Sequence, residues 1–413
     1  MNRKLYWAEI IFAVIGFLFY SGATIGGLRF VLPLGPVNLL LRYGLLVGSF
    51  ILLLLRWRGT LFTLQKSLLI WLLIGLMFAS LIWSINPQET FTQLRADLLP
   101  MMLFSLYFAS RFSLDEQLEV VSMALGAGLL MSIFCAVVVP SVGVHPAGSA
   151  FAGAWKGVYI EKNGFGAISV LTANVLFLKA IFAKKHYFRA WFPFGLAMLA
   201  VLRSTSKTSL ALSFVTLLII FSIYHFKWQG KRTILISDIL ILIVGGVITY
   251  AISQFDNVFG SLSGRTDVWS FALHRLGEDY FWFGFGKGAF FNTPAIMESF
   301  RFEYQYMVNH AHNGYLETLL DIGFVGVIIF LICFVLIYSK SFQLAYKADR
   351  PSELFPITLL NFLLLQNLSE SYLTYRANIV WVLFVSTCLS VNKYTFIKSK
   401  IAASRRSDYN TST

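Results

Sequence analysis

Two histidines stand two residues apart at the end of a long polar interval, in the run His310-Ala311-His312-Asn313. An imidazole titrates near neutral pH, so one of them could act as a general base, with Asn313 orienting it by hydrogen bonding. A metal site has less support, because residues two apart share a face only on an extended strand and no third ligand stands at a recognisable spacing. His312 and Asn313 could also simply cap the helix expected after them.

Several cations are expected at the outer ends of membrane spans, where positive charge is less common than at the inner ends. An anionic ligand at the outer face would explain them, although a single Arg or Lys at such a place often reaches lipid headgroups instead. Lys207 would begin a helix, where free N–H groups form an anion site, and its neighbours Ser206 and Thr208 also fit simple capping. The cations and one neighbouring amide are Arg95, Lys162, Asn163, Arg203, Lys207 and Arg265.

Carboxylates accompany these cations. Glu317 and Asp321 are four residues apart and therefore share one face of the helix expected after His312. Glu370 is expected near the outer end of another span, where it could pair with Arg376, Arg95 or Lys162. Carboxylates in a membrane are costly and usually face a cavity or a partner, so structural ion pairs and proton coupling in a transporter both stay open.

The elements that carry these residues are apolar. The chain has 413 residues, of which 57% are hydrophobic and 13% charged, and its mean hydropathy is +0.70. Apolar runs of about 20 residues can cross a bilayer as helices. We therefore predict an all-α polytopic membrane protein with about twelve (10–12) transmembrane helices. The runs lie near 7–28, 36–55, 67–85, 97–110, 117–139, 163–182, 188–202, 208–225, 233–252, 314–338, 354–369 and 377–391, and the fourth, seventh and last are short.

Charge predicts the orientation. The formal net charge of +13 is spread over many short connections on one side of the predicted spans, which is typical of cytoplasmic loops. Both termini are thus expected in the cytoplasm, and the dispersed charge does not indicate nucleic-acid binding. Cys135, Cys333 and Cys388 fall within predicted spans and indicate no disulfide framework.

The predicted organisation is one transmembrane domain over residues 1–392, with a large periplasmic loop at 253–313 and a polar cytoplasmic tail at 393–413. The tail is expected to lack structure from Arg405 onward. Within the loop, apolar residues at helical spacing predict an amphipathic helix over Asp267–Leu276. The glycine-rich and aromatic run from Phe281 to Gly288 could close over a site or form an interfacial belt.

Several motifs, taken in order, resemble the O-antigen ligase/polymerase superfamily, and within it the succinoglycan-type exopolysaccharide-polymerase branch. They are Trp155-Lys156-Gly157-Val158-Tyr159, Lys162-Asn163-Gly164-Phe165-Gly166, Ser206-Lys207-Thr208, Gly264-Arg265-Thr266-Asp267-Val268-Trp269 and His312-Asn313-Gly314-Tyr315-Leu316-Glu317. Two departures stand out: Lys207 occupies a position where the ligases usually have Arg, and Glu161 one where the polymerases often have His.

The resemblance implies a glycosyltransferase of GT-C-like architecture in the bacterial inner membrane, using no metal and no cofactor. It would transfer glycan from a polyprenyl-diphosphate-linked oligosaccharide to an acceptor glycan at the outer face, among membrane lipids and with a flippase and a chain-length regulator as partners. His312 would be the base, and Arg265, Lys207 and Arg203 would hold the diphosphate. The supporting residues would be Arg95, Lys162, Asn163, His310, Asn313, Glu317 and Glu370.

Three functions follow as hypotheses. The leading one is a polymerase of a surface polysaccharide or exopolysaccharide. The second is an O-antigen ligase that transfers polymer to lipid A-core. The third is a transporter of polysaccharide precursors, which should show internal repeats or paired broken helices, and the sequence shows neither.

Overall fold

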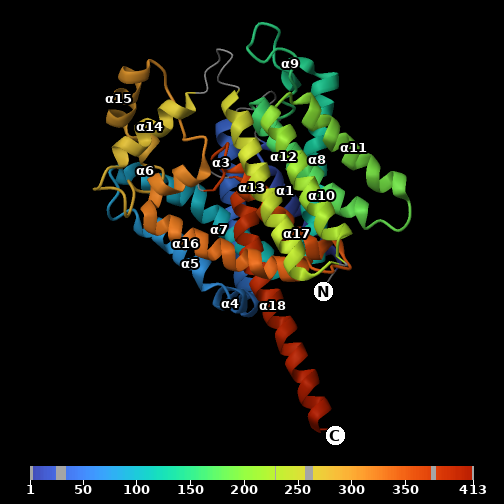
Figure 1. The fold of residues 1–413 in the computed structure, drawn as a ribbon. Helices are drawn as coiled ribbons and strands as arrows, with labels where there is room; N and C mark the ends of the chain where they lie inside the picture. The colour runs from blue at the N-terminus through green and yellow to red at the C-terminus, as the bar shows by residue number, and fades with distance from the viewer. Residues whose placement is uncertain (1–2, 25–33, 228, 256–263, 374–377, 412–413) are drawn as a thin grey trace.

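The computed structural model describes residues 3–24, 34–227, 229–255, 264–373 and 378–411, and they form helices joined by loops (Figure 1). The first half contains α1 (Arg3–Tyr20), α3 (Leu34–Leu55), α4 (Trp57–Gln65), α5 (Leu68–Ala79), α6 (Pro87–Gln93), the π-helical η1 (Leu94–Leu98), α7 (Leu99–Arg111), α8 (Leu114–Val138), α9 (Pro140–Gly143), α10 (Lys162–Ile181) and α11 (Tyr187–Arg203). The second half contains α12 (Lys207–His225), α13 (Lys231–Phe255), α14 (Arg265–Leu276), the 3-10 turn η2 (Phe290–Asn292), α15 (Pro294–Tyr304), α16 (Gly314–Ala345), α17 (Pro351–Gln366) and α18 (Ile379–Thr411).

Six of the described helices are long and apolar enough to cross a membrane, and α4 with α5, bent by 91°, could form a seventh span. The six are α3, α8, α10, α12, α16 and α18. Each of the twelve apolar runs nevertheless coincides with a helix, although part of the first run lies outside the described residues. Four of these helices, α5, α7, α11 and α17, are between 12 and 17 residues long. The helical class is therefore confirmed.

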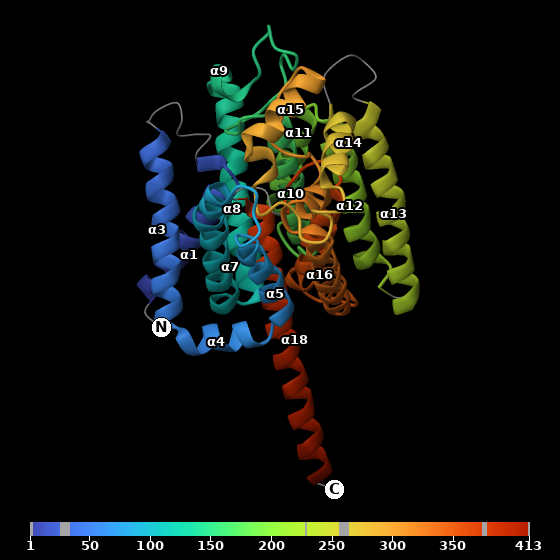
Figure 2. The same cartoon turned by 90° about the vertical axis from the view of Figure 1, so that its left-hand side faces the viewer.

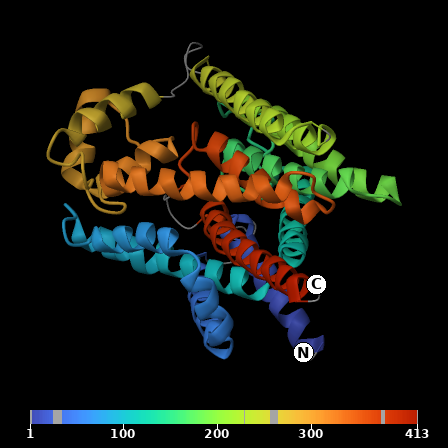
Figure 3. The same ribbon diagram turned by 60° about the horizontal axis from the view of Figure 1, so that its bottom comes forward.

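The helices form a bundle with two distinct ends. The start of α1 and the end of α18 lie toward one end, whereas α9, α14 and α15 lie at the other (Figures 1 and 2). Figure 2 shows α4 lying across the lower end, roughly perpendicular to its neighbours. Viewed from below, α16 and α18 run between the N-terminal helices and the pair α12 and α13 (Figure 3). Trp381 on α18 is almost fully buried and belongs to the main hydrophobic core.

The last helix differs from expectation. The final span was expected to be short and the tail to lack structure from Arg405, but α18 is a continuous helix of 33 residues ending at Thr411. It leaves the bundle and projects beyond it (Figures 1 and 2). Both expectations were wrong, because the polar residues after Asn392 continue a helix already started by the buried apolar segment, and extending a helix costs far less than starting one.

Helix α16 is broken near its start. Ile322 and Gly323 have non-helical backbone angles, and φ of Gly323 is +66°. The loop from Phe281 to Gly286 replaces the missing bonds: N–H groups of Phe285 and Gly286 donate to carbonyls of α16 at 2.7 and 3.1 Å, and the N–H of Phe324 donates to Phe281 O at 2.8 Å. The glycine-rich run therefore fills the break in α16, a role that its sequence did not suggest.

The segment from Gly264 to Asn313, here called the α14–α15 lobe, packs around a small hydrophobic cluster that it shares with Leu316 and Leu320 of α16. α14 confirms the predicted amphipathic helix and buries Val268, Phe271 and Leu276. These side chains share a cluster with Phe290 and Phe300 from the same lobe. This shared cluster attaches the lobe to the start of α16, next to the histidine run.

Candidate active site

The histidine run lies between α15 and the start of α16. Asn313 caps α16, because its Oδ1 accepts hydrogen bonds from the N–H groups of Tyr315 at 3.0 Å and Leu316 at 3.1 Å. Of the open alternatives for Asn313, the structure thus supports capping and gives no contact with an imidazole. Gly314 lies so close to α17 that a Cβ there would come within 2.0 Å of Asn367 Oδ1. These contacts fix the direction in which the histidine run leaves the helix.

The two imidazoles lie side by side although the backbone is not an extended strand. His312 has a φ of +50°, a left-handed conformation that reverses the direction of the chain locally. The ring centroids of His310 and His312 are consequently 4.0 Å apart. The buried Ala311 between them donates its N–H to Glu317 Oε2 at 2.8 Å and accepts at its carbonyl from Trp269 Nε1 at 2.7 Å. Contacts from α14 and α16 thus hold this strained turn.

Glu370, in the loop after α17, joins the site from a distant part of the sequence. Its Oε2 lies 3.2 Å from His312 Nδ1 and 3.8 Å from His310 Nε2. Its Oε1 lies 3.4 Å from a terminal nitrogen of Arg265, the first residue of α14. The sequence offered Arg376, Arg95 or Lys162 as partners of Glu370; the structure gives Arg265 this place and puts Arg95 over the ring of Phe91, and Arg376 lies outside the described residues. We call Arg265, His310, His312 and Glu370 the histidine–glutamate site.

Neighbouring groups keep the Glu370 carboxylate ionised. Burial alone would raise the pKa of Glu370, but the contacts of its carboxylate with His310 and His312 and the positive charge of Arg265 hold that pKa well below its usual value. Glu370 is therefore ionised at neutral pH and can only accept hydrogen bonds. It follows that His312 Nδ1 carries a hydrogen toward Glu370, which leaves Nε2 of a neutral ring as the acceptor.

Glu317 holds the backbone and the loop that carry the imidazoles and Glu370. Its Oε2 accepts from the Ala311 N–H and from Ser371 Oγ, the latter at 3.2 Å. Ser371 Oγ in turn accepts from the Asn313 N–H at 3.2 Å. Glu317 thereby ties the histidine run to the loop that carries Glu370.

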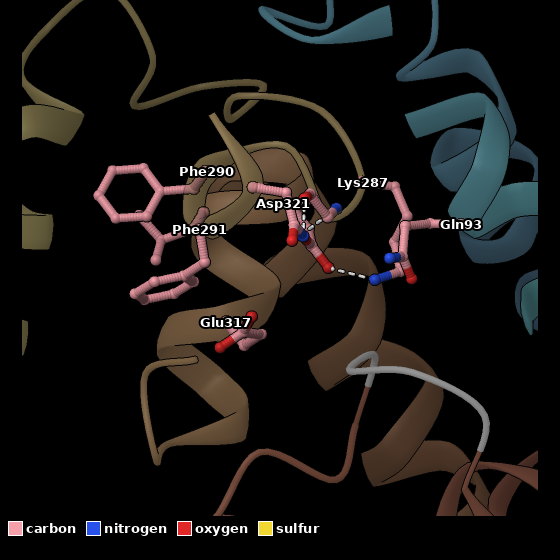
Figure 4. Close-up of a pocket in the computed structure, with 9 residues that line it drawn as sticks. Gln93, Lys287, Phe290, Phe291, Glu317 and Asp321 are labelled. Atoms are coloured by element: carbon pink, nitrogen blue, oxygen red, sulfur yellow. Dashed lines mark hydrogen bonds and ion pairs between the residues drawn. The ribbon is translucent and has the colours of Figure 1, made fainter. Parts of the chain in front are cut away.

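A buried ion pair lies one helical turn further along α16. Lys287 Nζ is 3.0 Å from Asp321 Oδ2, and the two side chains are 5% and 3% exposed. Figure 4 shows this pair near Glu317, Gln93 and the rings of Phe290 and Phe291. Nothing in the sequence singled out Lys287, although the helical spacing of Glu317 and Asp321 did indicate a need for a partner. The pair anchors the glycine-rich run to α16.

The other expected cations lie around the turn between α11 and α12. Arg203 stacks over Trp155 at 4.9 Å, and Lys162 lies over Phe151 at 4.6 Å and donates to Thr205 O at 3.5 Å. Ser206 caps α12 by accepting from the Ser209 N–H at 3.3 Å, which places Lys207 in the first helical turn. Two of the predicted residues, Asn163 and Arg95, form no hydrogen bond or ion pair with the described residues of the histidine–glutamate site or of the turn between α11 and α12. Asn163 is half-buried in the first turn of α10, and Arg95 is exposed on η1 over the ring of Phe91.

Lys207 also borders an open apolar groove of about 790 Å³ on the outer surface of the helices, here called the apolar cavity, where the side chain of Phe214 is 70% exposed. Its lining comes from α10 to α13 and includes Phe177, Met198, Phe214 and Ile248. A lysine beside such a cavity places one positive charge next to a long apolar surface. This is the arrangement expected for an amphiphile with an anionic head.

The cavity and the histidine–glutamate site lie toward the same end of the bundle. α12 and α13 are connected by a short turn and pack together, with Gly245 against Val215, so the start of α12 lies near the end of α13. Tyr250, near that end, stacks on Trp269 with ring centroids 6.0 Å apart. Trp269 is the residue that donates to the carbonyl of Ala311. A short chain of contacts therefore links the two regions.

The helical bundle and its apolar helices define a polytopic membrane protein. Residues 192–331 match the family model described as O-Antigen ligase, which runs from α11 into α16 and includes Lys207, Arg265, His310 and His312. This match covers less than half of the chain; it supports the resemblance to the O-antigen ligase/polymerase superfamily and does not confirm the succinoglycan-type branch. The match supports a glycosyltransferase of the ligase/polymerase type and does not separate the branches. No curated protein matches the chain.

Proposed function

We propose that this protein polymerises a bacterial surface polysaccharide or exopolysaccharide. It would transfer glycan from a polyprenyl-diphosphate carrier to the hydroxyl of an acceptor sugar at the outer face of the inner membrane, with both of its termini in the cytoplasm. One observation carries the proposal: Glu370 contacts His312 through one oxygen and Arg265 through the other, at 3.2 and 3.4 Å. This arrangement places an oriented base next to a fixed positive charge.

The reaction needs both groups. Nε2 of His312 accepts the proton of the acceptor hydroxyl while that oxygen attacks the anomeric carbon. The bond from this carbon to the diphosphate breaks, and the electron pair leaves on the diphosphate oxygen. Because a diphosphate departs as an anion, it needs positive charge and not the second carboxylic acid that a glycosidase uses to protonate a leaving alcohol. Arg265 supplies that charge, and Glu370 keeps the imidazole in the tautomer that can act as a base.

The carrier has a second requirement, which is a place for its prenyl chain. The apolar cavity beside Lys207 suits this chain, and Lys207 with Arg203 would attract the diphosphate to its mouth. Lys is a compact point charge and lacks the bidentate fork of Arg. We therefore assign Lys207 to electrostatic capture, and Arg265 to charge stabilisation during transfer.

A ligase that joins finished polymer to lipid A-core is the second candidate, because the matching family model is described as O-Antigen ligase and does not separate the two branches. Both reactions use the same donor and the same chemistry. They differ in the acceptor, which the histidine–glutamate site does not specify.

The two candidates predict different intermediates in cells. Replacing His312 with Ala in a polymerase should make carrier-linked single repeat units accumulate, whereas in a ligase it should make carrier-linked long polymer accumulate. Carrier-linked glycans extracted from cells with equal protein levels can be sized to tell these results apart. A normal distribution of glycans in the His312→Ala strain would reject both candidates.

A further inference from the structure

The histidine–glutamate site has a geometry that hydrogen bonding alone does not require. His310, His312 and Glu370 each offer one ligand atom, and these three atoms all lie within 4.8 Å of one another. In tetrahedral coordination with bonds of about 2.0–2.1 Å, ligand atoms lie about 3.3 Å apart. The distances of 3.2 and 3.8 Å from Glu370 Oε2 to the two imidazole nitrogens bracket that value.

We propose that these three side chains form a binding site for one divalent transition-metal ion of the Zn²⁺ class. Two imidazole nitrogens and one carboxylate oxygen are the donors that such an ion prefers, and they leave a fourth position open for water. Mg²⁺ and Ca²⁺ prefer oxygen donors throughout, so this site should discriminate against them.

The surroundings favour a site that is already formed. The left-handed turn at His312 is held by Ala311, whose N–H and carbonyl are both bonded to side chains. Glu370 is held by Arg265 through Oε1, which leaves Oε2 directed at the imidazoles. An outer partner on a metal-binding carboxylate is a common feature of metal sites. The positive charge of Arg265 opposes a second cation, so we expect reversible binding and not a permanently bound ion.

An ion can also reach the site. The side chains of His310 and His312 are 24% and 35% exposed. No large rearrangement is needed before an ion meets its ligands. The site therefore responds to free metal in the surrounding solution.

Binding would switch off transfer, a consequence that rests on the proposed function. A neutral imidazole that binds a metal through Nδ1 carries its hydrogen on Nε2. His312 in that state cannot accept a proton from the acceptor hydroxyl. The metal-bound protein should be inactive, and a chelator should restore it.

The binding test uses the full-length protein in nanodiscs, purified without a histidine tag. Equilibrium dialysis against Zn²⁺ should give one ion per chain for wild type, and His310→Gln should weaken binding at least about tenfold. His274→Gln removes an exposed histidine of the same lobe and should leave binding unchanged. Retained thermal stability shows that His310→Gln is folded, and Glu370→Gln serves as a second variant. Equal zinc binding by wild type and both site variants, or equal loss in His274→Gln, would overturn the proposal.

The activity test is separate. Zn²⁺ should abolish polymer growth, EDTA should restore it, and Mg²⁺ at the same concentration should have no effect. Full activity with the site saturated by Zn²⁺ would overturn the inhibitory role. Absence of any product without Zn²⁺ would count against the proposed function and leave the binding result intact.

Discussion

At the scale of single residues, Glu370 organises the chemistry. Its carboxylate is shared between Arg265 and the two imidazoles, so in the proposed reaction it would position both the base and the positive charge. All four residues of the histidine–glutamate site were candidates from the sequence alone. That they lie in contact was not predictable, because Glu370 is 58 residues from His312 and a left-handed turn brings the two histidines together.

The first prediction concerns Glu370→Gln. This change keeps the shape but removes the charge that orients His312, so we expect transfer to fall by about 10² or more, comparable to losing general-base catalysis. The same variant should change the pH dependence of the rate, which a purely structural role would not do. Initial rates across pH test this, with Glu298→Gln on the exposed face of α15 as the matched control. Rates and pH profile equal to wild type would contradict the role of Glu370.

The second prediction concerns stability at acid pH. The folded pKa of Glu370 lies below its usual value of 4.5, so its ionised form stabilises the fold at neutral pH. That contribution is lost as the pH falls below the usual value toward the folded pKa. Glu370→Gln should therefore lose less thermal stability than wild type between pH 7 and pH 4. Melting curves in nanodiscs measure the difference, and identical losses would refute it.

At the scale of elements, the break in α16 is the structural feature on which the site depends. The first part of α16 carries Glu317 and Asp321, and the glycine-rich run docks against the break. The apolar run at 314–338 predicted one helix, and nothing in its periodicity indicated an interruption. Gly323 alone was a weak signal, since an isolated glycine within a helix is usually tolerated.

The third prediction concerns Gly323→Ala. A Cβ at this position would lie 2.3 Å from the backbone of Trp282 and Phe283, and φ is +66°. We expect destabilisation of about 2 kcal/mol or more, from the left-handed conformation together with the close approach. Gly75→Ala in α5, where no atom lies within 4 Å of the added methyl, should be neutral or slightly stabilising. Thermal unfolding compares the two, and equal effects would show that the break does not require glycine.

The fourth prediction concerns the Lys287–Asp321 pair. Lys287→Met leaves a buried carboxylate without its cation, which costs about 3–5 kcal/mol. Adding Asp321→Asn removes the uncompensated charge and should recover part of the loss. Thermal stability of the single and double variants decides this. A double variant no more stable than Lys287→Met would mean that the pair does not act as a charge pair.

At the scale of the whole molecule, the bundle places the chain termini and the α14–α15 lobe at opposite ends. The start of α1 and the end of α18 lie opposite the α14–α15 lobe (Figure 1). The distribution of Lys and Arg predicts that the end with the termini faces the cytoplasm and the lobe faces outward, and this orientation stays a prediction. Composition and apolar runs were sufficient to predict a helical membrane protein with helices at these places. The lengths of individual helices were not predictable, because burial against neighbours decides where a helix ends.

The fifth prediction follows from this arrangement. A cysteine introduced at Phe302, which is 85% exposed on α15, should react with a membrane-impermeant maleimide in intact spheroplasts. A cysteine at the exposed Ser404 on α18 should react only after the membrane is opened. The three native cysteines lie within helices. Labelling of the protein without an introduced cysteine measures their background reaction with the maleimide. The opposite labelling pattern would reverse the orientation and exclude transfer at the outer face.

The most direct test of the central claim is a transfer assay with purified protein in nanodiscs and a polyprenyl-diphosphate-linked oligosaccharide as donor and acceptor. The account predicts a ladder of longer lipid-linked glycans with wild type and with His274→Ala, and none with His312→Ala. A ladder that persists in folded His312→Ala would contradict the assignment of His312 as the base.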